Sequence, residues 1–194
     1  MKRTLASLFL STFITLIFST SALAAETFIL DDNHSYVLWR IKHLGFSTQS
    51  GKWFVKGSVS LDKDNPENSH VEVSIDMDKL VTGLPELDKH LKDKLFFDVA
   101  KYPTATFVSN KVKQLSDNTA KIEGTLNFHG VSKPITLDVT LNKVGKNPIN
   151  DRTTVGFTAT TELKRSDFGM NTLLPALGDE VSIEIGAEAY QVKS

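Results

Sequence analysis

The sequence predicts an all-β protein: an eight-stranded antiparallel up-and-down barrel with one helix between its third and fourth strands. Eight stretches of the chain alternate apolar and polar residues, and the clearest is residues 71–77. Successive side chains of a strand point to opposite faces, so each stretch has one apolar and one polar face. The even number of strands and the mostly short connections favour a closed barrel over a two-sheet sandwich, which would produce the same alternation.

The first four strands are expected at about residues 35–43, from residue 51 onward, at 71–77 and from residue 104 onward. Their inward faces carry these residues: Val37, Trp39, Ile41, Trp53, Val55, Gly57, Val59, Leu61, Val71, Val73, Ile75, Met77 and Phe107. Between the third and fourth strands, Leu84, Leu87 and Leu91 recur at helical spacing, and Pro85 suits a first helical turn. We therefore expect a helix at about 85–94 that borders or plugs one end of the barrel.

The last four strands are separated by a turn at Gly130, a loop at 143–151 and a longer loop at 164–179. Their inward faces carry Ala120, Ile122, Gly124, Leu126, Phe128, Ile135, Leu137, Val139, Leu141, Val155, Phe157, Ala159, Leu163, Val181, Ile183, Ile185, Ala187 and Ala189. No linker or repeat interrupts the pattern, so residues 25–194 are expected to form one domain.

The N-terminal residues 1–24 have the pattern of a cleaved secretory signal peptide. Lys2 and Arg3 precede a mostly apolar run, and Ala22 and Ala24 give the small-x-small pattern of a cleavage site. The run is short for a membrane span. We expect cleavage after Ala24 and a mature protein in the periplasm.

Composition excludes several classes of function. The mature chain would carry 20 basic residues against 23 acidic ones, a net charge of −3, whereas a nucleic-acid partner requires a basic face. The absence of cysteine excludes disulfides, thiolate catalysis, Cys–zinc sites and a lipoprotein anchor. None of the five histidines lies two to four residues from another, so we expect no metal site and no required cofactor. Strand parity places His70 and His129 on the outer face.

The interior of such a barrel is either solid or hollow enough for one small ligand. The inward faces mix large side chains, such as Trp53 and Phe157, with small ones, such as Gly124 and Ala159, and composition leaves both possibilities open. A cavity between these faces would be almost free of charge and would suit a hydrocarbon chain. Each buried CH₂ contributes about 0.8 kcal/mol, so a tail of ~15 carbons would gain roughly 12 kcal/mol before ordering costs.

Four sequence blocks resemble the YceI-like periplasmic proteins, in the order in which that family carries them. The blocks are Asp32-Asn33-His34-Ser35 with Trp39 and His43-Leu44-Gly45-Phe46-Ser47; Asp88-Lys89-His90-Leu91 with Phe96-Phe97-Asp98 and Tyr102-Pro103-Thr104-Ala105-Thr106-Phe107; Gly124-Thr125-Leu126-Asn127-Phe128-His129-Gly130-Val131-Ser132-Lys133-Pro134; and Arg165-Ser166-Asp167-Phe168-Gly169-Met170. The resemblance implies a lipocalin-like barrel with a long polyisoprenoid or similar lipid in its lumen, such as a polyprenyl quinone or a fatty-acid derivative.

Candidate ligand-binding residues come from the inward faces and from the loop before the last strand. They are Val37, Trp39, Ile41, Trp53, Val55, Val59, Val73, Ile75, Met77, Phe107, Ile122, Leu126, Phe128, Leu137, Val139, Phe157, Ala159, Phe168, Met170, Ile183 and Ile185. Asp88, His90, Arg165 and Asp167 are candidates for contacts with the lipid head group at the mouth of the barrel. The alternative for Arg165 and Asp167 is a surface ion pair that orders the loop.

The expected function is non-catalytic binding, sequestration or transport of a long-chain isoprenoid or fatty amphiphile. Transient membrane contact would allow lipid exchange, and a homodimer is compatible with the sequence. One alternative is an enzyme acting on such a lipid, with Ser35, Ser166 or Asp167 near a histidine, although the chain has no Gly-x-Ser-x-Gly elbow. Another is a solid-cored barrel that serves as an interaction module.

Overall fold

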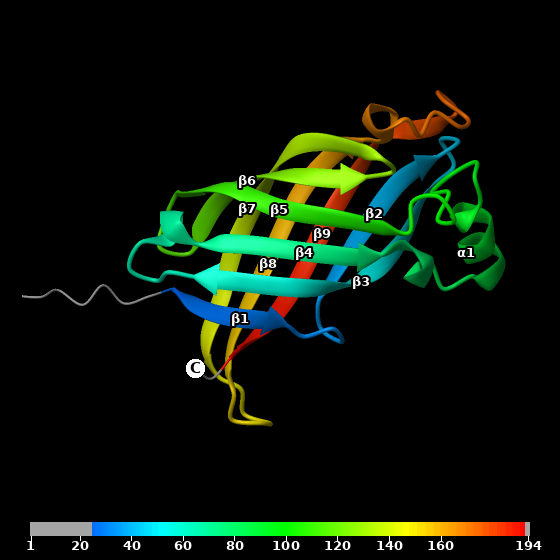
Figure 1. Cartoon of the computed structure of the whole chain (residues 1–194). Helices are drawn as coiled ribbons and strands as arrows, with labels where there is room; N and C mark the ends of the chain where they lie inside the picture. The colour runs from blue at the N-terminus through cyan, green and yellow to red at the C-terminus, as the bar shows by residue number, and fades with distance from the viewer. Residues whose placement is uncertain (1–24, 193–194) are drawn as a thin grey trace, which may run out of the picture.

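The computed structural model describes residues 25–192, and the expected signal peptide lies outside them. Eight strands, β2 to β9, form a closed ring in which each strand is antiparallel to both neighbours and β2 pairs with β9 (Figure 1). This confirms the predicted up-and-down barrel. The strands are β1 (Glu26–Leu30), β2 (Tyr36–His43), β3 (Ser47–Leu61), β4 (His70–Asp76), β5 (Thr104–Gln114), β6 (Thr119–Phe128), β7 (Val131–Lys146), β8 (Thr153–Lys164) and β9 (Leu177–Gln191).

Strand β1 was not predicted, and it completes the ring beside β2. It pairs with β3 on one side and with β9 on the other, as β2 does further along the same two strands. β1 and β2 therefore both lie between β3 and β9, one after the other along the barrel, and residues 31–35 connect them. The sequence signal is weak because only Phe28 and Leu30 of this five-residue strand point inward and are buried.

The other differences from prediction concern strand ends. β7 continues to Lys146 through residues that were expected to form a loop, and β9 begins at Leu177 instead of near Val181. Bulges in both strands shift the pairing register, at Leu141/Lys143 between β7 and β8 and at Ile41/His43 between β2 and β9. A bulge breaks the alternation of faces, so a strand that continues beyond it no longer shows the period of two.

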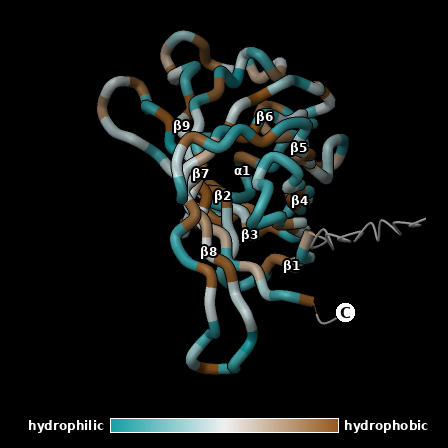
Figure 2. Tube along the Cα trace, turned by 90° about the vertical axis from the view of Figure 1, so that its left-hand side faces the viewer, coloured by the Kyte–Doolittle hydropathy of each residue, from teal (hydrophilic) through white to brown (hydrophobic). Residues whose placement is uncertain are grey.

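The two ends of the barrel differ in construction. At the hairpin end, connections 62–69, 115–118 and 147–152 join consecutive strands, and Figure 2 views the molecule from this side. The closed end carries helix α1 (Pro85–Lys92), the short helices η2 (Met77–Lys79) and η3 (Arg165–Phe168), and the β8–β9 connection (Figure 1). α1 lies where it was expected, between the third and fourth strands of the ring. Across residues 25–192, no helix is long and apolar enough to cross a bilayer.

Aromatic side chains fill the closed end of the barrel. Phe97, from the segment after α1, lies with its ring centroid 5.0 Å from Trp53, 6.3 Å from Trp39 and 6.2 Å from Phe128. The Phe168 ring meets Phe128 at 5.4 Å in an edge-to-face arrangement. Such pairs stabilise by about 0.5–1.5 kcal/mol beyond the burial of their surface. We call these five rings the aromatic plug.

Candidate ligand-binding cavity

The barrel is hollow between the aromatic plug and the hairpin end. A cavity of about 340 Å³ lies inside it, within the range of about 300–1,000 Å³ that is usual for ligand pockets. All eight strands of the ring contribute lining residues. Away from the hairpin end the lining is apolar apart from Thr161. A buried polar group without a partner costs roughly 1–3 kcal/mol, so this wall suits a hydrocarbon chain and disfavours sugars or nucleotides.

The cavity exists because side chains that point inward from different strands do not meet at the centre of the barrel. Val55 and Val155 are buried to 2% exposure or less beneath β1. By contrast Ile135, Val139 and Ile185 also point into the barrel but are only half-buried. Because inward residues of a solid core would cover one another, their partial exposure shows that the centre of the barrel is unfilled.

Most of the candidate ligand-binding residues line this cavity. They are Val37, Trp53, Val55, Val59, Val73, Ile75, Met77, Phe107, Ile122, Leu126, Phe128, Leu137, Val139, Phe157, Ala159, Ile183 and Ile185. Trp39, Ile41, Phe168 and Met170 do not line it. They pack at the closed end, where Trp39 and Phe168 belong to the aromatic plug.

Several lining residues were not among those candidates. Apolar ones are Leu30, Leu61, Val71, Ala105, Val112, Ala120, Ile135, Leu141, Leu163 and Ala187. Leu30 belongs to the unpredicted strand β1, and most of the others lie on the predicted inward faces. At the hairpin end the lining becomes polar, and we call this group the polar rim: Asp62, Lys63, Pro66, Ser69, Gln114, Ser116, Asp117, Asn118 and Thr119. These residues lie in and beside the β3–β4 and β5–β6 connections, and no sequence pattern separates them from ordinary turns.

Arg165 was expected at the mouth of the barrel, but it is a buried structural residue at the closed end. Its side chain donates from Nε to the carbonyl of Gly178 (2.7 Å), from Nη1 to Met170 (2.6 Å) and from Nη2 to Leu177 (3.0 Å). Burial lowers the pKa of Arg165, while nearby Asp179 opposes this change. All three nitrogens of the guanidinium group are thus occupied, two by carbonyls at the start of β9 and one by the β8–β9 connection.

The other three head-group candidates also lie at the closed end and do not line the cavity. Asp88 accepts from the backbone N–H (2.7 Å) and hydroxyl (2.6 Å) of Thr82 before α1. The His90 ring packs edge-on against Phe96 at 4.9 Å, and Asp167 pairs with Lys133 at 2.9 Å on the surface. These contacts order the closed end, and neither they nor Arg165 reach the polar rim.

Replacing Arg165 should therefore reduce stability without changing ligand content. Arg165→Ala would remove the donors to one buried and two partly buried carbonyl groups, and hydrogen bonds to charged groups contribute roughly 1.5–3 kcal/mol each. We expect a loss of about 3 kcal/mol or more in the free energy of unfolding, measured by urea titration. The amount of extractable lipid per folded molecule should stay at the wild-type level. A lower lipid content in folded Arg165→Ala protein would instead show that Arg165 contributes to ligand binding.

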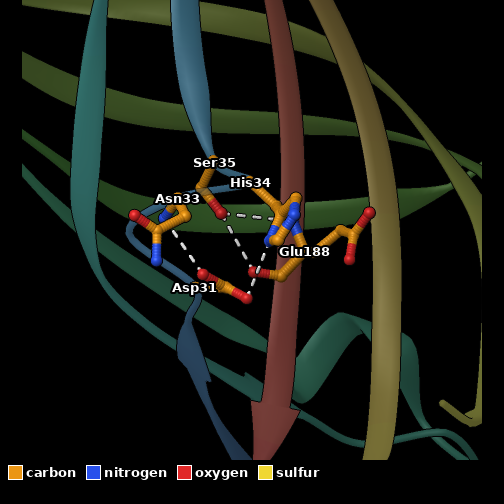
Figure 3. A network of polar contacts seen from close by, with 5 residues as sticks. All are labelled: Asp31, Asn33, His34, Ser35 and Glu188. Carbon is orange, nitrogen blue, oxygen red and sulfur yellow. Dashed lines mark hydrogen bonds and ion pairs between the residues drawn. The ribbon is translucent and has the colours of Figure 1, made fainter. Parts of the chain in front are cut away.

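The break between β1 and β2 is held by a small polar network, shown in Figure 3. The buried hydroxyl of Ser35 donates to the carbonyl of Glu188 (2.9 Å) and accepts from the backbone N–H of the same residue (3.2 Å). The Asp31 carboxylate accepts from the backbone N–H of Asn33 (3.0 Å) and bonds to His34 Nδ1 (2.9 Å). The Ser35 hydroxyl thus bonds to the backbone of β9 in place of the backbone hydrogen bonds between strands, where the chain turns out of the sheet. In the same turn Asp31 is the partner of His34.

This network predicts a pH-dependent contribution to stability. The hydrogen bond between His34 Nδ1 and the Asp31 carboxylate raises the pKa of His34 and lowers the pKa of Asp31. The stability that His34 contributes is complete below its unfolded pKa and is lost as pH rises through its folded pKa. The stability that Asp31 contributes is complete above its unfolded pKa and is lost as pH falls through its folded pKa. The loss of stability caused by His34→Gln, followed by urea titration, should be largest between the unfolded pKa values of Asp31 and His34, about 4 and 6.5, and should fade as pH rises through the folded pKa of His34. A loss independent of pH would contradict this assignment.

The serines considered for catalysis are occupied elsewhere. Ser35 is bonded to Glu188, and Ser166 donates to Asp179 Oδ2 at 2.8 Å, so neither hydroxyl bonds a histidine. His129 was placed on the outer face, but it adopts a left-handed turn after β6 and packs against Tyr102 at 4.5 Å. Within residues 25–192, no cluster of three or more His, Asp or Glu side chains is arranged to hold a metal ion.

Comparisons with known proteins agree with this architecture. A UPF0312 protein of Pseudomonas putida is 41% identical over 195 residues, covering 100% of both chains. The crystal structure of a Campylobacter jejuni YceI protein matches with a TM-score of 0.71 at 30% identity, over 78% of this chain and 90% of that one. A polyisoprenoid binding domain from Saccharophagus degradans shares the fold, with a TM-score of 0.67 at 15% identity over 85% of this chain and 98% of that domain. The YceI-like domain model matches residues 28–189, and the protein therefore belongs to the YceI-like family.

Proposed function

We propose that this protein binds a long-chain isoprenoid or fatty amphiphile in its barrel and carries or sequesters it in the periplasm without changing it covalently. The single observation that carries the proposal is the apolar cavity of about 340 Å³ inside the closed barrel. The polyisoprenoid-binding description of the Saccharophagus domain, which has the same fold, supports this class of ligand. A polyprenyl quinone fits the proposal, and no cofactor is required for it.

Burial of the lipid tail would supply the binding energy. Each methylene transferred from water into the cavity contributes about 0.8 kcal/mol, and a tail of ~15 carbons would gain roughly 12 kcal/mol before the costs of ordering it. A bilayer offers the same tail a similar gain. Exchange between the cavity and a membrane would then be close to neutral in free energy, as a carrier requires.

Solvent extraction followed by mass spectrometry tests the proposal on protein purified from its natural host. The expected result is a long-chain lipid in about one-to-one proportion to protein. Protein that carries no lipid but hydrolyses a lipid ester would support the enzyme alternative instead. Protein that carries no lipid, takes up no lipid from vesicles and hydrolyses no lipid ester would contradict the proposal. That result would favour the remaining alternative, an interaction module.

A further inference from the structure

The polarity of the cavity lining changes along the barrel axis. At the hairpin end Asp62 and Ser69, in the β3–β4 connection, line the cavity together with Gln114 and Asn118, at the neighbouring β5–β6 connection. Gln114 and Asn118 are exposed, so the cavity reaches the surface here. Leu115 lies beside them with 53% of its surface exposed. The mouth therefore combines hydrogen-bonding side chains with an exposed apolar side chain.

The opposite end of the cavity is blocked. Trp53 and Phe128 line the cavity, and Phe97 packs edge-on against Trp53 and at a tilt against Phe128. Phe97 and Trp39 do not line the cavity, so the lining stops at this layer. A ligand with one polar and one apolar end would meet apolar groups here, and Thr161 is the one polar side chain of the lining near this end.

Charges at the rim favour an uncharged head group. Lys63 is the rim's only cation, and its ammonium pairs with Glu26 at 2.8 Å. The backbone N–H of Asn65 and the side-chain amide of Asn68 donate to the Asp62 carboxylate and lower its pKa. Asp117 adds a second carboxylate to the rim. A phosphate or carboxylate head group would meet two carboxylates and an already paired lysine.

We propose that the ligand enters tail first at the hairpin end, that its uncharged polar head group stays at the polar rim, and that the end of its tail lies against Trp53 at the aromatic plug. This orientation rests on the proposed function, because it assumes a lipid in the cavity. Amide and hydroxyl groups of Gln114, Ser116 and Asn118 would bond to the head group. At about 3.3 Å per residue, the eight steps from Trp53 to Leu61 place the plug about 26 Å along β3 from the rim.

The two tryptophans of the chain, Trp39 and Trp53, both lie in the aromatic plug, so the intrinsic fluorescence reports on that end alone. The probes are methyl esters of stearic acid with a nitroxide either near the ester group or near the methyl end of the tail. Nitroxides quench tryptophan only at short range. Both esters should bind, and the one labelled near the methyl end should quench several-fold more strongly.

Stronger quenching by the ester labelled near its head, or equal quenching by both, would overturn the orientation while leaving lipid binding intact. Failure of both esters to bind, measured by gel filtration with the spin signal as readout, would instead count against the proposed function. The two ideas can therefore fail separately.

A pair of variants tests the entry route independently. Gln114→Phe/Asp117→Phe narrows the mouth and should slow uptake of the ester at least tenfold. The control, Leu84→Phe/Leu173→Phe, places the same two phenyl rings at two exposed positions of the closed end and should leave the uptake rate unchanged. Slower uptake by the control and not by the mouth variant would show that the ligand enters at the closed end.

Discussion

Val139→Trp should empty the barrel of lipid while leaving the fold intact. Val139 points into the cavity from β7, and its neighbours on the adjacent strands are Ala120 and Ala159. These two small residues leave room for an indole ring, which would occupy the space of part of the tail. Displacing about four methylenes would cost about 3 kcal/mol, or roughly a hundredfold in affinity.

Thr136→Trp is the matched control for this variant. Thr136 lies on the same strand but faces outward and is exposed. Both proteins would be purified in parallel, and their lipid content compared by extraction and mass spectrometry, with circular dichroism as a check on folding. Wild-type lipid content in folded Val139→Trp protein would show that the ligand lies outside this cavity.

Phe97→Ala should cause a large loss of stability, about 3 kcal/mol in the free energy of unfolding. Phe97 is half-buried and contacts Trp39, Trp53 and Phe128, and truncation would remove its packing against all three rings. Urea titration followed by tryptophan fluorescence measures the loss, since the contacts of both tryptophans are affected.

Phe46→Ala provides the comparison for Phe97→Ala. Phe46 lies in the β2–β3 turn with 90% of its surface exposed, so its removal should change stability by less than about 0.5 kcal/mol. Equal effects of the two substitutions would mean that the closed end does not depend on the packing of Phe97.

The closed barrel could be predicted from the sequence because each inward face repeats with a period of two over several residues. The helix at Pro85 could be predicted for the same kind of reason, as its leucines recur at helical spacing. β1 was missed because two inward residues are too few to show a period, and the extension of β7 was missed because a bulge breaks the period.

The hollow interior could not be decided from the sequence because small inward residues have opposite consequences in different places. At Gly124 a Cβ atom would lie 2.3 Å from the Phe107 ring, so this gap is filled. Ala120 and Ala187 face the cavity, where nothing fills the space they leave. The pairing register between neighbouring strands decides whether a large side chain covers a small residue. Amino-acid composition contains no information on this register.

Arg165 illustrates a second limit of sequence reasoning. A charged residue in a long loop beside apolar residues suggested a mouth, but the loop folds back and surrounds the side chain with its own carbonyl groups. The polar rim lies at the other end of the barrel, in turns whose composition resembles that of any surface connection.

The most direct test of the lipid-carrying barrel is the electron density inside a crystal of protein purified from its natural host without added lipid. We expect continuous, elongated density that begins at the polar rim and ends at Trp53, with the bulk of a head group only at the rim. A cavity that holds ordered water alone, in protein that also fails to take up lipid from vesicles before crystallisation, would contradict it.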